Sequence, residues 1–319
     1  MWIFPTVGLT LEYGSVRVVR DMPSEKVTIM EFIENPTQVG EFQRFSRVFF
    51  SRKVVVFGLI IVLALIITAI FAPWLAPYPP NKMDLAQGLL NPSHEHLLGT
   101  DNFGRDTLSR LLYGSRISIM VGAIAVGIAA SIGMVLGLVA GYFGGKTFVI
   151  IMRLLDAIMA IPMIALALVV ASLLGGGLKN VMVAVAIALM PMYARLMCGQ
   201  VLSVRENDYI TAQQSIGASA WRIMFRHILP NCFPPLIVQM TMMMGTAILT
   251  EASLSFLGIG IEPPTAAWGA MVTDGYRYLI SNPILSFAPG VAIMLVVFGF
   301  NMVGDGLRDA LDPRLRGTL

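Results

Sequence analysis

Few residues of this chain have the types and spacing that catalysis or ligand binding requires. His94 and His96 flank Glu95, but no third ligand follows at a suitable spacing, so we predict exposed loop histidines and no metal site. The segment Ala140–Thr147, A-G-Y-F-G-G-K-T, is similar to a phosphate-binding loop, yet alanine replaces its first glycine. Such a loop also needs a preceding strand, and here a long apolar stretch precedes it. We therefore expect no nucleotide, metal or other cofactor on this chain.

The composition indicates where most of the chain lies. Of 319 residues, 56% are hydrophobic and only 13% are charged, whereas soluble domains carry about 25% charged residues. Most of the chain is therefore expected in lipid. The net charge of +3 gives no reason to expect nucleic-acid binding. Cys198 and Cys232 lack metal-binding or redox spacing and are expected to be buried thiols.

Six apolar stretches are long enough to cross a bilayer, whose core of about 30 Å needs about 20 helical residues. The first is closed by Pro73, and in lipid each stretch must be a helix because unpaired backbone amides are costly there. The sequence predicts an all-α membrane protein with six transmembrane helices: Val54–Ala72, Ile117–Phe143, Val149–Leu174, Val181–Arg195 with a possible extension to Val201, Phe233–Phe256 and Ile284–Val303.

The distribution of lysine and arginine predicts the orientation. With a cytoplasmic N-terminus, thirteen of these residues flank the spans inside and six lie outside, as the positive-inside rule favours. Both termini are expected inside a multi-pass protein of the cell membrane. We divide the chain into a cytoplasmic tail (1–46), a first helix with an extracytoplasmic segment (47–116), a domain of five helices (117–305) and a C-terminal cytoplasmic tail (306–319).

Four residues within the apolar stretches are candidates for a translocation pathway or gate, since ionisable groups and helix breaks at membrane depth are often functional. Asp156 follows Arg153 by three residues, so a structural ion pair is the alternative. Glu251 could line a pathway or form a hydrogen bond inside the bundle. Pro162 and Pro191 are expected to kink their helices, which suits either a moving gate or a static bundle.

The long inside loop, residues 202–231, contains a helix–glycine–helix pattern. A first helical stretch ends near Ile216, Gly217 permits a tight bend, and Leu229-Pro230 is expected to end the second stretch. The second stretch has apolar residues at i, i+3, i+4 and i+7, which predicts an amphipathic helix with Arg222 and Arg226 on its other side: Trp221, Met224, Phe225 and Ile228.

This loop resembles the coupling loop of ABC importer membrane subunits, whose pattern is E-A-A, three residues, Gly, nine residues, Ile, one residue, Leu-Pro. Gly217 and Leu229-Pro230 match it, but Thr211, Gln213 and His227 depart from it. The resemblance implies that the loop attaches separate ATPase subunits through the following residues: Tyr209, Thr211, Ala212, Gln213, Gly217, Ala218, Trp221, Arg222, Phe225, Arg226, Leu229 and Pro230.

Three further segments resemble the second membrane subunit of dipeptide and oligopeptide permeases, in the peptide/nickel subfamily: His96–Arg116, Glu251–Met271 and Leu311–Arg316. The resemblance covers the chain from about Phe45 onward. It implies the MetI-like fold of type I importers and a non-catalytic subunit. It also implies a second, homologous permease, two ATPase subunits that bind ATP and Mg, an extracytoplasmic solute-binding protein, and a peptide substrate.

The same resemblance suggests a use for the outer segment. Asp101/Arg105 and Asp106/Arg110 stand at i,i+4 spacing, where helical ion pairs contribute only tenths of a kcal/mol. We expect them to form a polar face that meets the solute-binding protein.

Three alternatives remain open. The same architecture could import nickel chelates or another small solute. A membrane enzyme would need a motif such as HExxH or GxSxG, and the sequence has neither. A stand-alone channel or carrier would have no use for the long inside loop.

Overall fold

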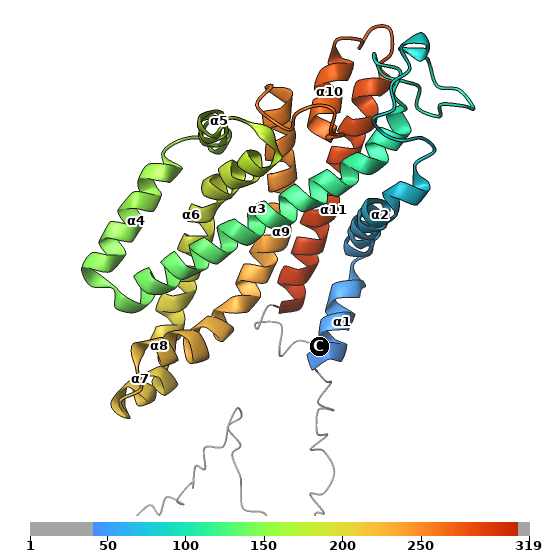
Figure 1. Ribbon diagram of the computed structural model, residues 1–319. Helices are drawn as coiled ribbons and strands as arrows, with labels where there is room; N and C mark the ends of the chain where they lie inside the picture. The colour runs from blue at the N-terminus through green and yellow to red at the C-terminus, as the bar shows by residue number, and fades with distance from the viewer. Residues whose placement is uncertain (1–40, 312–319) are drawn as a thin grey trace, which may run out of the picture. The chain divides into compact units, whose positions relative to one another are not determined.

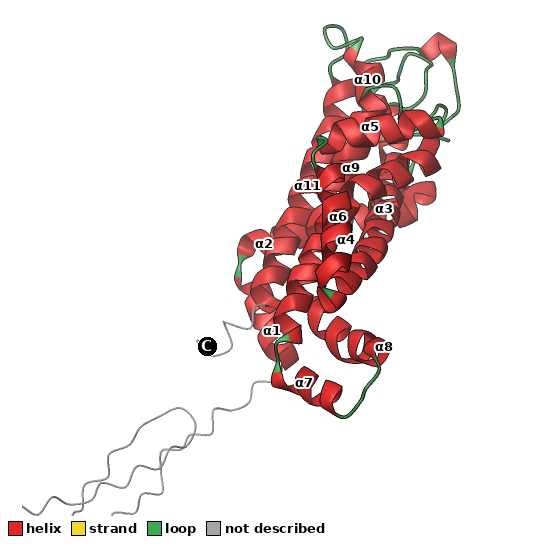
Figure 2. Cartoon of the chain, turned by 90° about the vertical axis from the view of Figure 1, so that its left-hand side faces the viewer, coloured by secondary structure: helices red, strands yellow, loops and turns green. Residues whose placement is uncertain are grey.

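The computed structural model describes residues 41–311, so most of the predicted N-terminal tail and most of the Leu311–Arg316 motif lie outside the described residues. All regular elements in this range are helices (Figures 1 and 2). They are α1 Glu41–Ser51, α2 Lys53–Leu75, the 3-10 helix η1 Leu85–Gln87, α3 Thr107–Phe143, α4 Gly145–Met159, α5 Met163–Leu174, α6 Gly177–Arg205, α7 Asp208–Ser215, α8 Ala220–Arg222, the π-helix η2 Ile223–Ile228, α9 Leu229–Phe256, α10 Trp268–Tyr276 and α11 Ile284–Leu311.

The helices run back and forth between two ends of a bundle. Figure 1 shows α1, α7 and α8 at one end, and α10 with the loops around η1 at the other. Five helices are long and apolar enough to cross a membrane, and six crossings result when α4 and α5 together count as one. The predicted set of six apolar helical stretches is thereby confirmed.

The third predicted span is not a single helix. It divides into α4 and α5, whose axes differ by 90°. Pro162 begins α5 as its N-cap with an extended ψ of 134°, and a proline disfavours helical backbone in the residue before it. The predicted change of direction at Pro162 is present, but it is a break between two helices and not a kink within one. In contrast, α6 continues as one helix through the buried Pro191.

Other boundaries differ from the predicted ones where a local cap or pairing extends the helix. The second span begins at Thr107 instead of Ile117, because the Asp106 side chain accepts a hydrogen bond from Ser109 N and caps α3. The first span does not end at Pro73 but continues to Leu75. At the other end of the chain, α11 passes Val303, and Asp309 pairs with Arg52 at 2.7 Å.

The tightest helix packing joins α3 to α6. Gly133, Gly137 and Gly141 stand at four-residue intervals on α3, where an added Cβ would lie within 2.3–2.8 Å of α6 atoms. At Gly137 the nearest atom would be the Ala194 carbonyl oxygen. Small residues at this spacing let helix backbones approach closely, which stabilises helix pairs in membranes by van der Waals contact. This pair forms the scaffold for the elements described next.

Candidate functional site

The segment from α7 to η2 (residues 208–228), hereafter the α7–α8 segment, turns sharply at Gly217. Gly217 has φ +78°, and the Gly217 and Ala218 amides donate to the carbonyls of Gln214 and Gln213 at 3.0 Å. This hydrogen-bond pair is a Schellman motif, which requires left-handed backbone at the glycine. Ser219 then accepts from Arg222 N at 3.4 Å and caps α8. The predicted helix–glycine–helix pattern is present in the structure.

The exposed face of this segment differs from the predicted one. Trp221 and Phe225 stack with ring centroids 5.2 Å apart and are 67% and 44% exposed. Arg222 and Arg226 lie exposed on the same side. By contrast, Met224 and Ile228 are buried, together with Ile223. The prediction of one apolar face with arginines opposite was therefore wrong, and aromatic rings and guanidinium groups share the outward face.

The reason for this difference is the π-helix η2. Its wider turn puts Ile223, Met224 and Ile228 on one side, whereas α-helical spacing would group Trp221 with Met224. The same turn leads directly into α9, so Leu229-Pro230 does not end the helix as predicted. Pro230 lies in the first turn of α9, where a proline is tolerated. One helical segment of 37 residues thus runs from Ala220 to Phe256.

Three of the four charged residues of the outer segment, Arg105, Asp106 and Arg110, are buried and Asp101 is partly buried, so the prediction that they form an exposed polar face was wrong. Arg105 and Arg110 are 2% and 3% exposed. Asp101 pairs with Arg105 at 2.6 Å, although in a loop and not in a helix. Arg110 donates to the carbonyls of Pro80 and Pro264 at 3.2 Å and does not pair with Asp106. These groups hold the outer segment together and join it to the loop before α10.

Asp106 forms a hydrogen bond with His96, a pairing that the sequence analysis did not predict. The distance from His96 Nδ1 to Asp106 Oδ1 is 2.8 Å, and from His96 Nε2 to Gln87 Oε1 it is 3.1 Å. His96 is 6% exposed, so the prediction of two exposed loop histidines holds only for His94. Because Asp106 also caps α3, the pair links the loop around η1 to the start of that helix.

Asp156 has two arginine partners. Arg153 lies 3.8 Å away on the same helix, as expected, and Arg195 of α6 contacts the other carboxylate oxygen. Sequence spacing indicates the local partner only. The second pair ties α4, just before the break at Pro162, to α6. All three groups are partly exposed in the chain alone.

Glu251 lies inside the bundle, 1% exposed. Ser255 Oγ donates to Glu251 Oε1 at 2.7 Å and accepts from Ile261 N at 3.2 Å. These bonds fold the loop after α9 back onto the helix end. We predicted that Glu251 either lines a pathway or forms a hydrogen bond inside the bundle, and the structure contains the hydrogen bond.

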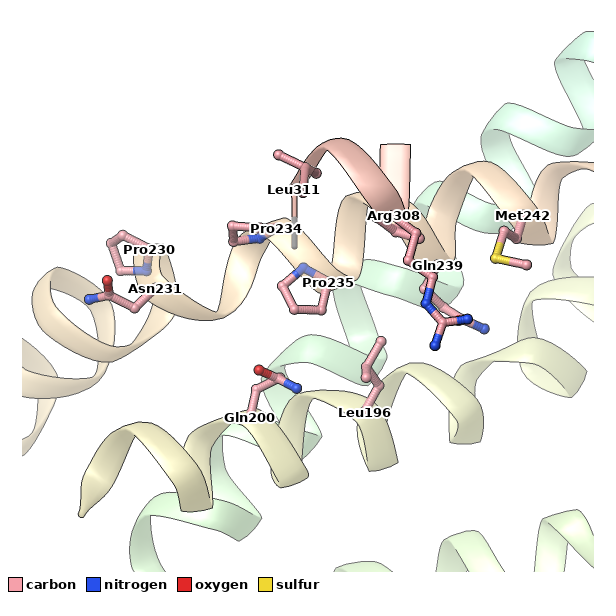
Figure 3. Close-up of a pocket in the computed structure, with 11 residues that line it drawn as sticks. Leu196, Gln200, Pro230, Asn231, Pro234, Pro235, Gln239, Met242, Arg308 and Leu311 are labelled. Atoms are coloured by element: carbon pink, nitrogen blue, oxygen red, sulfur yellow. The ribbon is translucent and has the colours of Figure 1, made fainter. Parts of the chain in front are cut away.

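A cavity of about 720 Å³ with both polar and apolar lining residues opens between α6, α9 and α11, near the end that carries the α7–α8 segment (Figure 3). We call it the α6–α9–α11 cavity. The sequence did not predict this cavity, because its lining residues come from three helices that are distant along the chain. The available signal was the position of Gln200 and Gln239, two polar residues within otherwise apolar stretches. It is lined by Leu196, Gln200, Pro230, Asn231, Pro234, Pro235, Val238, Gln239, Met242, Arg308 and Leu311.

These features define a multi-pass helical membrane protein with a protruding helix–turn–helix. Residues 133–317 match the model of the family described as binding-protein-dependent transport system inner membrane component, and the chain belongs to this family. Residues 40–92 match the N-terminal transmembrane domain of oligopeptide transport permease C. The chain is therefore a permease subunit of an ABC importer, as its sequence predicted, and lies in the inner membrane.

Known relatives cover most of the chain. It is 45% identical to a probable D,D-dipeptide transport system permease protein of Escherichia coli K12, over 81% of this chain and 87% of that protein. It is also 45% identical to a dipeptide transport system permease protein of Alkalihalophilus pseudofirmus, over 83% and 88%. An inward-facing structure of the MetNI methionine ABC transporter covers 64% of this chain and 96% of its own, with a TM-score of 0.53 and 20% identity. This likeness confirms the MetI-like fold.

Proposed function

We propose that this chain forms one half of the translocation pathway of an ATP-driven importer for short peptides and passes motion from separate ATPase subunits to that pathway. The relatives named for dipeptides, together with a glutathione permease of Pectobacterium atrosepticum that is 44% identical, favour peptides over nickel chelates. The proposed partners are a second permease, two ATPase subunits that bind ATP and Mg, and an extracytoplasmic solute-binding protein.

The observation that carries this proposal is the outward face of the α7–α8 segment. Trp221 and Phe225 present a stacked apolar surface to solvent, and Arg222 and Arg226 border it. Exposed aromatic residues and arginines are typical anchors of protein interfaces. In the proposed orientation both termini and this segment are cytoplasmic, which places the face where an ATPase subunit can bind it.

The proposed mechanism is alternating access. Nucleotide binding shifts the equilibrium between inward-open and outward-open states only if the ATPases bind the two states with different affinity. The break at Pro162 is proposed to let α4 move relative to α5, while the Asp156–Arg195 pair keeps α4 attached to α6. Pro191 and Glu251 are proposed to support the pathway from within the bundle. The outer segment, folded by its buried charges, is proposed to receive the solute-binding protein through its exposed loops.

The test uses two substitutions at one position. Gly217→Val places a β-branched residue at φ +78°, which is strongly unfavourable, whereas Gly217→Asn places there a residue that tolerates left-handed backbone. No other atom lies within 4 Å of an added Cβ, so steric clash does not confuse the comparison. Each variant is expressed with its partner subunits, and ATPase copurification and ATP-driven dipeptide uptake are measured.

We expect the valine variant to lose both activities and the asparagine variant to keep most of each. Normal ATPase attachment and uptake in the valine variant would show that this segment is not the docking site. Peptide uptake in the absence of any ATPase subunit would instead support a stand-alone carrier.

A further inference from the structure

We propose that the α6–α9–α11 cavity binds the transported peptide as a zwitterion, with Arg308 at its carboxylate and backbone carbonyls of α9 at its ammonium group. The inference rests on the proposed function and specifies where in this chain the peptide is held. The wall of this cavity combines one cation, Arg308, with the uncharged polar side chains of Gln200, Asn231 and Gln239, and its lining includes no acidic residue.

The cavity has a suitable size. Its volume of about 720 Å³ falls within the usual range of roughly 300–1,000 Å³ for small-molecule sites. Along α9 the wall extends from Asn231 to Gln239, a rise of about 12 Å. An extended dipeptide or tripeptide measures about 7–10 Å. The two charged ends of such a peptide therefore fit between these two positions.

The anionic end of the peptide has a partner in Arg308. Figure 3 shows its guanidinium group beside Gln239, at the opposite end of the cavity from Pro230 and Asn231. Within residues 41–311 no carboxylate pairs with Arg308, and the neighbouring Asp309 pairs with Arg52 instead. A guanidinium group matches the geometry of a carboxylate with two parallel hydrogen bonds.

The cationic end has acceptors on α9. Pro234 and Pro235 have no N–H, so the carbonyl oxygens of Pro230 and Asn231 lack the donors that a regular helix would supply four residues later. All four residues line the cavity. A backbone carbonyl without a donor in its own helix is free to accept a hydrogen bond from a ligand, and an ammonium group supplies three donors.

The middle of the cavity fits a peptide of any sequence. Gln200 on α6 and Gln239 on α9 line its two sides, and carboxamides both donate to and accept from a peptide bond. Gln239 Nε2 contacts only the Met192 sulfur, at 2.9 Å, which is a weak acceptor that a peptide carbonyl can replace. The remaining wall includes Leu196 and Met242, apolar and adaptable surfaces for varied side chains.

The test measures protection of a cysteine in the cavity. The membrane complex with its ATPases, but without the solute-binding protein, is placed in nanodiscs with Gln239→Cys, and the rate of maleimide labelling is measured with and without a millimolar dipeptide. The matched control is Ile237→Cys, which lies on the same helix, is 42% exposed and does not line the cavity. The dipeptide amide, which lacks the carboxylate, is the second ligand.

We expect the dipeptide to slow labelling at position 239 but not at 237, and the amide to require about tenfold higher concentration, the usual effect of losing one charge-assisted hydrogen bond. Arg308→Gln is expected to abolish the difference between dipeptide and amide, and Arg308→Lys to keep part of it. ATPase copurification with each variant checks its folding.

Three results would overturn the inference: no protection at position 239, equal protection by dipeptide and amide in the parent, or protection by anionic phospholipid alone, which would make this a lipid site. None of these three results contradicts the proposed function. The proposed function would be contradicted by a different result, namely that the full assembly takes up no short peptide when ATP is supplied.

Discussion

The contact between α3 and α6 can be tested by adding a single methyl group to Gly137. A Cβ there would lie 2.3 Å from the Ala194 carbonyl oxygen and 2.7 Å from Met197 Cβ. Since comfortable contacts begin near 3.5 Å, Gly137→Ala must push the helices apart by about 1 Å. Overpacking of this kind costs about 1–3 kcal/mol. The substitution also gains about 0.5–1 kcal/mol from backbone entropy, which leaves a net destabilisation of up to about 2.5 kcal/mol.

The matched control is Gly127→Ala on the same helix, where nothing lies within 4 Å of an added Cβ. Only the entropic gain applies there, so this variant is expected to be slightly more stable than the parent. The assay is thermal unfolding of the purified complex, in which 1 kcal/mol is expected to shift the midpoint by about 2 °C or less, because the shift falls as the unfolding unit grows. If alanine shifts the midpoint equally at 127 and 137, the close approach of α3 and α6 is refuted.

Four further substitutions, in three tests, probe the remaining contacts. Asp106→Asn keeps a capping oxygen but loses the charge opposite His96, so it is expected to lower stability by about 1 kcal/mol, and an unchanged unfolding midpoint would argue against the pair. Asp156→Asn and Arg195→Gln are expected to be non-additive in a double-mutant cycle of uptake, whereas simple additivity would mean that the pair is not coupled. Burial raises the pKa of Asp274, against the lowering effect of Arg105 and other arginines. Its ionised form therefore destabilises the native state, and this cost disappears as pH falls through the native pKa. Asp274→Asn should raise the unfolding midpoint at pH 7 and lose that gain near pH 4, and a gain independent of pH would contradict the assignment.

The sequence predicted the crossings well because lipid permits few alternatives to a helix, so apolar length alone identifies a span. It did not predict the 90° break before Pro162, since the residues on both sides are apolar and the hydropathy does not change there. A helical pattern also cannot indicate π-helical turns, and for this reason Trp221 and Met224, predicted on one face, lie on different ones.

Contacts between distant parts of the chain were the least predictable. The predicted partner of Asp156 was the neighbouring Arg153, while its second partner, Arg195, lies on another helix. The buried position of His96 likewise depends on Gln87 and Asp106, which a loop without regular periodicity brings together. Spacing along a helix indicates local pairs, but only the packed structure shows which loops and helices meet.

The helical segment from Ala220 to Phe256 connects the exposed aromatic pair to the membrane without an intervening loop, although it is π-helical at Ile223–Ile228 and contains Pro234 and Pro235. At about 1.5 Å per residue its 37 residues have a contour length of about 55 Å. Trp221, Asn231 and Gln239 thus belong to one continuous helical segment. In the proposed mechanism, a partner that binds the protruding end therefore acts on the cavity wall through the backbone of this segment and not through a flexible linker.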